Sequence, residues 1–284
     1  MSGRFASRVA VVTDSTASLP TALVAERGIT VVPLQVVIGG TSYEEVTPAE
    51  LAAALKEWTP LSTSRPSPES VLAVYQRLAA DADEIVSVHL SSELSGTFES
   101  VQLAARQSPV PVVTVDSRQV GMGTGFAVLT AAEAAAAGAS AAEAGEAARR
   151  RVIGTTSLFY VDTLEHLRRG GRVGTAAALV GSALSVKPIL SVQDGRITPY
   201  ERVRTSAKAL ARLAELAVQA AGEGPVDVAV AHLASPERAG QLAERLGADL
   251  ADRLQGRELV VGEIGAVLGA HVGPGMVAVT VAPR

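Results

Sequence analysis

Hydrophobic runs and polar loops alternate regularly along the first half of the chain. Three times, a run of Val, Ile and Ala residues of strand length is followed by a hydroxyl-rich loop and then by a helical pattern. The three segments are RVAVVTDSTASLPTALVAERG (8–28), IVSVHLSSELSGTFES (85–100) and VPVVTVDSRQVGMGTGFAVLTAAEAAAAG (110–138). Continuous apolar strands that alternate with helices indicate a parallel β-sheet covered on both faces.

Shorter elements are expected between the first two of these segments. ITVVPLQVVI (29–38) predicts one short strand, and YEEVTPAELAAALKEW (43–58) predicts an acidic helix. In the third segment, the helix is expected to begin after Gly125, and in the first near Pro20.

The pattern changes after the arginine run 149–151. Residues 157–174 predict a strand, a short basic helix and a glycine turn, and the dipeptide Asp194-Gly195 between alternating segments predicts a β-hairpin. Helices and strands then alternate to the end of the chain. We therefore expect an α/β protein of two domains, a parallel-sheet domain over 1–155 and a mixed α/β domain over 156–284.

Composition narrows the class of protein. A chain of 284 residues is long enough for two domains, and 48% hydrophobic residues with only nine aromatic ones predict a core of Ala, Val and Leu. The absence of cysteine excludes disulfides, thiolate catalysis and Cys-ligated metals, and fits a reducing compartment. A net charge of −4 argues against nucleic acid as a partner. The chain has no signal-peptide pattern and no apolar run long enough to span a membrane, so we expect a cytoplasmic protein.

Several cofactor and catalytic motifs are missing from the sequence. It contains no Walker A loop and no G-x-S-x-G elbow, and GMGTGF (121–126) has Phe126 where a dinucleotide fingerprint needs glycine. The four histidines are far apart and lack a metal-ligand spacing. No cofactor or metal is expected.

The hydroxyl-rich loops remain as candidate chemistry. Ser91, Ser92, Ser95 and Thr97 crowd the point where a strand becomes a helix, and all three loops should meet at one sheet edge. Helix starts with hydroxyl groups stabilise a carboxylate or a phosphate. Taken singly, such residues are more often helix caps and turns, but three loops together favour an anion site.

Two residues near glycines can complete this site. Arg172 follows a glycine pair, and His271 lies in GAHVGPG (269–275). The alternative interpretations are a solvated charge at a helix end for Arg172 and an ordinary turn histidine for His271.

Seven ordered motifs from Val9 to Gly275 resemble the DegV family of bacterial fatty-acid-binding proteins. They are VAVVTDSTASLP, TSRPSPESV, SVHLSSELSGTFESV, VDSRQVGMGTG, LEHLRRGGRVG, VKPIL with DGRITPYERVRT, and HVGPG. The resemblance implies a Rossmann-like amino-terminal DegV domain, a carboxyl-terminal mixed α/β domain and a long-chain fatty acid, such as palmitate, stearate or oleate, buried between them.

The resemblance also implies a role for particular residues. The carboxylate-binding threonine and serine of the family fall on Thr63 and Ser95, and Arg172 and His271 match the arginine and histidine of its polar network. The protein would be the non-catalytic subunit of a fatty acid kinase, whose separate ATP-dependent subunit makes an acyl phosphate for phospholipid synthesis. Arg204 matches the arginine associated with the kinase encounter.

One residue departs from the family pattern. Arg65 stands where glutamine is usual, next to the expected head-group site. It can tighten anion binding or point to solvent, and we expect solvent because arginine is rarely buried unpaired. The apolar stretch 176–190 suits the lining of a tunnel, although ordinary core packing of an apolar helix is slightly favoured for each of its residues taken singly.

Two other functions are compatible with the residues. One is a hydrolase or acyltransferase that acts on acyl esters, with Ser95 as nucleophile and His271 as base. The other is a regulatory module that binds a small phosphorylated metabolite at the same loops.

Overall fold

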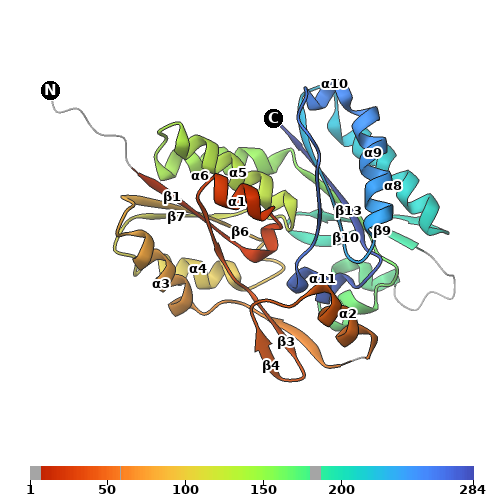
Figure 1. Ribbon diagram of the computed structural model, residues 1–284, viewed down its shortest axis with the longest axis horizontal. Helices are drawn as coiled ribbons and strands as arrows, with labels where there is room; N and C mark the ends of the chain where they lie inside the picture. The colour runs from red at the N-terminus through yellow and green to blue at the C-terminus, as the bar shows by residue number, and fades with distance from the viewer. Residues whose placement is uncertain (1–7, 58, 180–186) are drawn as a thin grey trace. The chain divides into compact units, whose positions relative to one another are not determined.

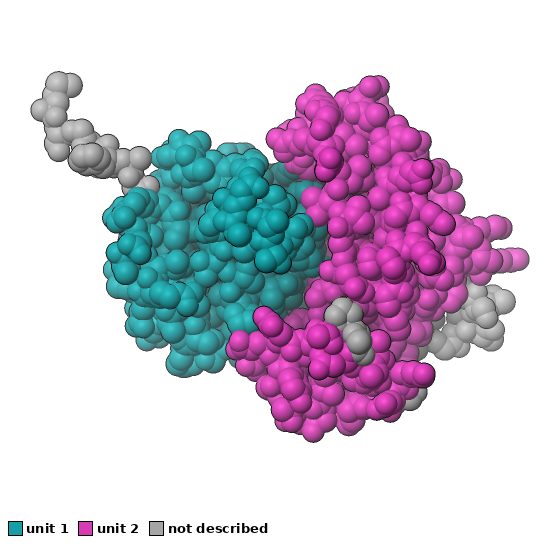
Figure 2. Space-filling view, viewed as in Figure 1, with its two compact units in different colours: residues 1–34, 65–153 teal, residues 35–64, 154–284 magenta. Residues whose placement is uncertain are grey.

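The chain folds into two compact units, which Figure 2 shows in different colours. The computed structural model describes residues 8–57, 59–179 and 187–284. Unit 1 comprises Met1–Leu34 and Arg65–Ile153, and unit 2 comprises Gln35–Ser64 and Gly154–Arg284. Residues 35–64 thus group with the carboxyl-terminal half, and the division into domains 1–155 and 156–284 stays a prediction.

Unit 1 is built on a four-stranded sheet in which every pair of strands is parallel, as the sequence predicted. The strand order is β2-β1-β6-β7. The strands are β1 (Val9–Asp14), β2 (Ile29–Val32), β6 (Glu84–His89) and β7 (Val112–Asp116).

Helices cover both faces of this sheet (Figure 1). Val11 and Val12 of β1 are both buried but point to opposite faces, because side chains alternate along a strand. Val11 joins a core with α5 and α6, whereas Val12 joins a core with α3 and α4. The helices of unit 1 are α1 (Thr21–Glu26), α3 (Pro68–Leu78), α4 (Thr97–Ala105), α5 (Met122–Ala136) and α6 (Ala141–Ile153).

Helix α5 begins earlier than its glycines suggested. It starts at Met122 rather than after Gly125. A Cβ atom at Gly125 would lie only 2.8 Å from the backbone oxygen of Ala17. This glycine therefore serves close packing inside the helix and not the turn before it.

Unit 2 contains a six-stranded mixed sheet, which confirms the expected second α/β part. The order is β10-β9-β8-β13-β11-β12, and only the pair β11 and β12 is parallel. Asp194 and Gly195 form the predicted hairpin turn with φ angles of 50° and 80°. The strands are β8 (Thr156–Tyr160), β9 (Lys187–Gln193), β10 (Arg196–Val203), β11 (Val226–His232), β12 (Val260–Glu263) and β13 (Val277–Pro283).

Helices α8 and α9 pack on this sheet through a core of Leu, Val and Ala side chains. Residues 180–186, which belong to the stretch suggested as a tunnel lining, lie outside the described residues, while Ile189 and Leu190 are buried. The helices of unit 2 beyond residue 154 are α7 (Glu165–Arg169), the 3₁₀ helix η2 (Gly174–Leu179), α8 (Ser206–Ala221), α9 (Pro236–Asp249), α10 (Ala251–Leu254) and α11 (Ala266–Val272).

The single strand expected over residues 29–38 is two strands in two different sheets. Pro33 lies between β2 and β3, and it interrupts a strand because it has no backbone N–H to donate. Strand β3 belongs to an antiparallel sheet of unit 2 with the order β4-β3-β5, and α11 packs against β3 and β5. The strands of this small sheet are β3 (Gln35–Ile38), β4 (Thr41–Tyr43) and β5 (Leu61–Ser64), and helix α2 (Pro48–Lys56) lies between β4 and β5 in the chain.

Candidate functional site

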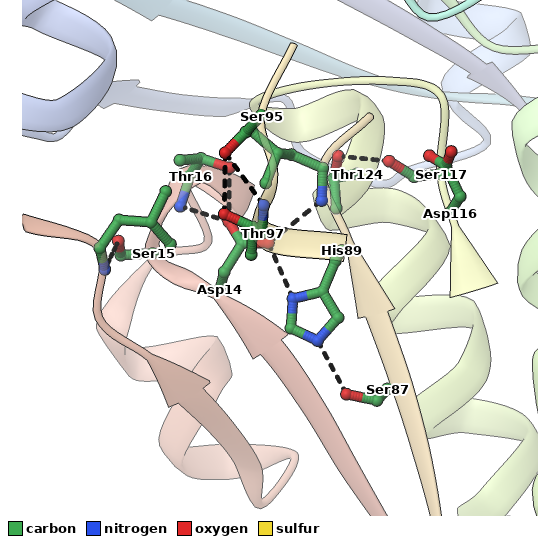
Figure 3. A network of polar contacts seen from close by, with 12 residues as sticks. Asp14, Ser15, Thr16, Ser87, His89, Ser95, Thr97, Asp116, Ser117 and Thr124 are labelled. Carbon is green, nitrogen blue, oxygen red and sulfur yellow. Dashed lines mark hydrogen bonds and ion pairs between the residues drawn. The ribbon is translucent and has the colours of Figure 1, made fainter. Parts of the chain in front are cut away.

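The three hydroxyl-rich loops of unit 1 leave its sheet at the same edge, as predicted. Strands β1, β6 and β7 end at Asp14, His89 and Asp116, and the parallel ladder pairs His89 directly with Asp116. Figure 3 shows the polar side chains that gather at this edge. The carboxyl edge of a parallel sheet is where such folds bind ligands.

Asp14 is the buried centre of this edge. Its carboxylate accepts hydrogen bonds from Thr16 N at 3.0 Å, from Thr16 Oγ1 at 2.5 Å, from His89 Nδ1 at 2.9 Å and from Leu90 N at 3.1 Å. Burial alone would raise the pKa of Asp14, but the hydrogen bond and charge of His89, with the bonds from Thr16 and Leu90, hold it below 3.8. One ionised carboxylate therefore fixes two of the three loops.

A chain of hydrogen bonds continues from Asp14 into the core of unit 1. His89 Nε2 lies 2.7 Å from Ser87 Oγ, and Ser87 Oγ lies 2.8 Å from the hydroxyl of Tyr75. The order Asp14, His89, Ser87 matches that of a hydrolase triad, yet Ser87 is 0% exposed. No substrate reaches this serine, so the network supports the loops and performs no catalysis.

Ser95 lies in a turn that begins helix α4. Its Oγ accepts a hydrogen bond from Thr97 N at 3.2 Å and lies 2.9 Å from Thr97 Oγ1. Ser95 is half-buried, whereas Thr97 is fully buried. The neighbouring hydroxyls serve the loops themselves, because Ser91 Oγ accepts from Glu93 N and Ser92 Oγ donates to Asp116.

Thr63 and His271 meet inside unit 2. Thr63 lies on β5 and His271 on α11, and Thr63 Oγ1 is 2.9 Å from His271 Nε2. Gly170 lies against the other side of the imidazole, since a Cβ atom there would come within 2.1 Å of His271 Nδ1. Both the histidine and the glycine turn that the sequence singled out thus belong to one cluster.

His271 is held neutral at physiological pH. Burial, together with the positive charge of Arg172, lowers its pKa from 6.5 to about 4. Its Nδ1 is buried and has no hydrogen-bond partner in the described part of the chain. A buried N–H without a partner is costly, so the tautomer that fits is the one with the proton on Nε2. In that tautomer Nε2–H donates to Thr63, and the Thr63 hydroxyl keeps its own proton for another acceptor.

A cavity of about 420 Å³ adjoins this pair within unit 2. Apolar side chains of β3, β5, α2 and α11 contribute to its lining, together with His166, Gly170 and His271. Ser62, which precedes Thr63, also lines it. Its volume falls in the range of small-molecule sites, about 300–1,000 Å³.

The three arginines proposed from the sequence lie in different parts of the structure. Arg172 belongs to unit 2 and donates from Nη1 to the carbonyl oxygen of Gly170 at 2.6 Å. Arg204 is exposed just after β10. Arg65 is half exposed but is not a free solvated charge, because it pairs with Glu99 at 2.5 Å. Ser95 and Arg65 belong to unit 1.

The pairing of Asp14, His89 and Ser87 was missed by the sequence interpretation, which treated His89 only as a histidine without ligand spacing. Ser87 and His89 are two residues apart on one strand and therefore share a face. That spacing, with an aspartate at the end of another buried strand, was the available signal. The register that brings the strands together is visible only in the fold.

No helix in the part of the chain that the structure describes has both the length and the apolar character needed to cross a membrane. Among the same residues, no three or more His, Cys, Asp and Glu side chains gather in a group that can hold a metal ion.

The sequence profile of the DegV family, described as uncharacterised proteins, matches residues 8–284. This chain therefore belongs to the DegV family. A DegV domain-containing protein of Streptomyces coelicolor is 53% identical over 281 residues, which are 97% of this chain and 99% of the relative.

Solved structures of relatives have the same fold. A fatty-acid-binding DegV family protein from Thermus thermophilus matches with a TM-score of 0.91 and 34% identity, covering 98% of this chain and 100% of that one. DegV of Bacillus subtilis, a fatty acid binding protein, matches with a TM-score of 0.89 and 33% identity over 98% and 100% of the two chains.

The lowered pKa of His271 predicts a pH-dependent stability. Between pH 6.5 and pH 4 the unfolded chain binds a proton at this residue and the folded chain does not, so stability is full above pH 6.5 and falls with pH. We expect this residue to account for a loss of about 1–2 kcal/mol in the free energy of unfolding between pH 7.5 and pH 5. Urea unfolding of the wild type and of His271→Gln, which does not titrate, measures it. An identical pH dependence in both proteins would contradict the neutral buried histidine.

Proposed function

We propose that this protein binds a long-chain fatty acid, such as palmitate, stearate or oleate, between its two domains and presents the carboxylate to a separate ATP-dependent fatty acid kinase. Thr63 and Ser95 hold the carboxylate, and Arg172 and His271 support them. The observation that carries the proposal is the Thr63–His271 pair beside a cavity whose lining is largely apolar but also includes Arg169 and His166. The fatty-acid-binding relatives from Thermus thermophilus and Bacillus subtilis add to it.

The acyl chain supplies the driving force for binding. A sixteen-carbon acid has about fourteen methylene groups, and at about 0.8 kcal/mol each their transfer from water contributes on the order of 11 kcal/mol before entropic losses. Removing the carboxylate from water opposes this by several kcal/mol unless it receives charge-assisted hydrogen bonds. The protein must therefore offer donors whose protons are not already used.

Both proposed hydroxyls meet this requirement in the same way. Thr63 Oγ1 accepts a hydrogen bond from His271 Nε2–H, and Ser95 Oγ accepts one from the Thr97 amide. The Thr63 hydroxyl can therefore direct its own O–H at the carboxylate, and Ser95 does the same when Thr97 Oγ1 is the donor in the 2.9 Å contact between the two hydroxyls. The Nε2–H tautomer of His271 is part of this arrangement, because the proton on Nε2 orients the Thr63 hydroxyl as a donor.

In this proposal the kinase catalyses phosphorylation of the carboxylate, and the fatty-acid-binding protein itself needs no cofactor. Arg204 is exposed and makes no hydrogen bond or ion pair with another described residue, so its guanidinium is available to a partner surface. The absence of cysteine in this chain fits the cytoplasmic setting of the proposal.

No observation favours the hydrolase or acyltransferase. That reaction needs His271 as a base near neutral pH, but its pKa of about 4 makes it a weak base. The Ser87, His89 and Asp14 chain is closed to substrates because Ser87 is fully buried.

The proposal is tested first on the purified protein. Expressed in a bacterial host and extracted with organic solvent, it should release a stoichiometric amount of long-chain fatty acid, identified by mass spectrometry. After delipidation it should bind palmitate in a titration that glucose 6-phosphate does not compete. Protein that carries no lipid and binds no palmitate would refute the function, and competition by the sugar phosphate would support the metabolite-binding alternative.

The head-group assignment predicts a selective loss. Thr63→Ala combined with Ser95→Ala should weaken palmitate binding by about 2 kcal/mol or more, because each hydroxyl donates to a charged group. Binding of 1-hexadecanol, which carries no charge, should weaken less. The control is Ser108→Ala with Thr130→Ala, which removes two hydroxyls that serve only local backbone contacts. Equal losses for the acid and the alcohol would assign Thr63 and Ser95 to folding alone.

Arg204 is expected to affect phosphorylation and not lipid binding. Arg204→Ala should leave the palmitate affinity of the protein unchanged and raise the concentration of loaded protein that the kinase needs for half-maximal acyl phosphate formation. Lys208→Ala is a matched control, since it removes another exposed cation from the next helix. Unchanged kinetics in Arg204→Ala would remove this residue from the partner surface.

A further inference from the structure

Arg65 is exposed to solvent, as its sequence context predicted, but it also contacts the first turn of α4. Its Nη1 donates to Glu99 Oε2 at 2.5 Å and to the carbonyl oxygen of Gly96 at 3.2 Å. The guanidinium lies so close to Gly96 that a Cβ atom there would be 2.3 Å from Nη1. Arg65 therefore rests on the turn that carries Ser95.

The contact with Gly96 reaches the Ser95 hydroxyl through one peptide group. The Gly96 carbonyl and the Thr97 N–H belong to the same planar peptide, so fixing the direction of one fixes the other. Thr97 N–H donates to Ser95 Oγ, while the Gly96 carbonyl accepts from Arg65 and from Ser100 N at 3.2 Å. Arg65 thereby orients the donor that holds the serine.

Glu99 anchors the guanidinium in this position. It lies in the first turn of α4, where a carboxylate is favoured by the helix dipole. The side chains of Arg65 and Glu99 are 51% and 67% exposed, so water screens the pair and its effect is modest. The ion pair matters because it holds Arg65 Nη1 within hydrogen-bond distance of the Gly96 carbonyl oxygen.

We propose that Arg65 is a positioning residue for the fatty-acid head group, which it serves by fixing the Gly96–Thr97 peptide that orients the Ser95 hydroxyl. The inference rests on the proposed function, since it concerns the same carboxylate. It assigns Arg65 no contact with the ligand. Its effect must therefore depend on Ser95 and must be specific for an acid.

The test compares palmitate and 1-hexadecanol affinities in a double-mutant cycle. Arg65→Ala should weaken palmitate binding about three- to five-fold, the range of an exposed ion pair, and leave 1-hexadecanol binding unchanged. In a Ser95→Ala background the same substitution should change palmitate affinity by less than about 1.5-fold, because linked residues are not additive. Arg106→Ala, at the far end of α4, is the control and should bind both ligands as the wild type does.

The substitution Gly96→Ala distinguishes the effect of the position of the Arg65 guanidinium from the effect of its charge. Its φ of −71° suits alanine, and the added methyl group displaces the flexible guanidinium while the charge stays nearby. We expect it to weaken palmitate binding as much as Arg65→Ala does. In both variants the Thr97 amide should exchange its hydrogen faster than in the wild type, which reports the loosened peptide without any ligand.

Each other outcome overturns the assignment. A palmitate loss in Arg65→Ala that persists in the Ser95→Ala background would mean that Arg65 acts on the ligand itself. Equal losses for both ligands would make the pair a support for folding only, and unchanged affinity or unchanged Thr97 exchange would leave Arg65 without a role. Failure of the wild type to bind palmitate would overturn the proposed function and this inference together, and it is seen before any variant is made.

Discussion

A carboxylate removed from water needs hydrogen-bond donors, and unit 1 meets this requirement at Asp14. Four donor groups from two loops converge on this buried side chain. Without it, His89 Nδ1 and two backbone amides would be buried without partners, which is far more costly than the loss of one surface contact. Two of the three loops at the carboxyl edge of the sheet are therefore held by one charge, and the second of these two, after β6, carries Ser95.

The proposed ligand carboxylate poses the same requirement, but the donors are hydroxyls rather than a buried cation. A hydroxyl both accepts and donates, so it becomes a committed donor only when a neighbour supplies its acceptor side. His271 does this for Thr63, and the Thr97 amide does it for Ser95. Arg172 contributes through the protonation state of His271, because its charge helps to keep the imidazole neutral. A charged imidazole would bind the anion more tightly but would itself need compensation when the site is empty.

Local patterns predicted the parts of the fold that local physics determines. The Val and Ile runs gave the parallel sheet, and the positive φ angles required at Asp194 and Gly195 explain why that dipeptide marked a hairpin. The sequence did not reveal that β3 leaves the first sheet, because an apolar strand has the same pattern in either sheet and Pro33 signals only an interruption. Nor did it reveal the pairing of Asp14 with His89, which depends on strand register, or that of Arg65 with Glu99, 34 residues apart in the chain.

The position of Arg65 in the chain explains why a modest surface pair can matter for binding. The chain passes from unit 2 to unit 1 between Ser64 and Arg65. Thr63 lies just before this passage, and two trans peptide groups keep its Cα within about 7 Å of that of Arg65. Arg65, which contacts the turn that carries Ser95, is thus linked through two peptide groups to Thr63, the other proposed carboxylate donor. Since a hydrogen bond weakens steeply when its direction changes, the proposed restraint of the Ser95 turn by Arg65 affects binding through alignment of the Ser95 hydroxyl and not through the small energy of one exposed ion pair.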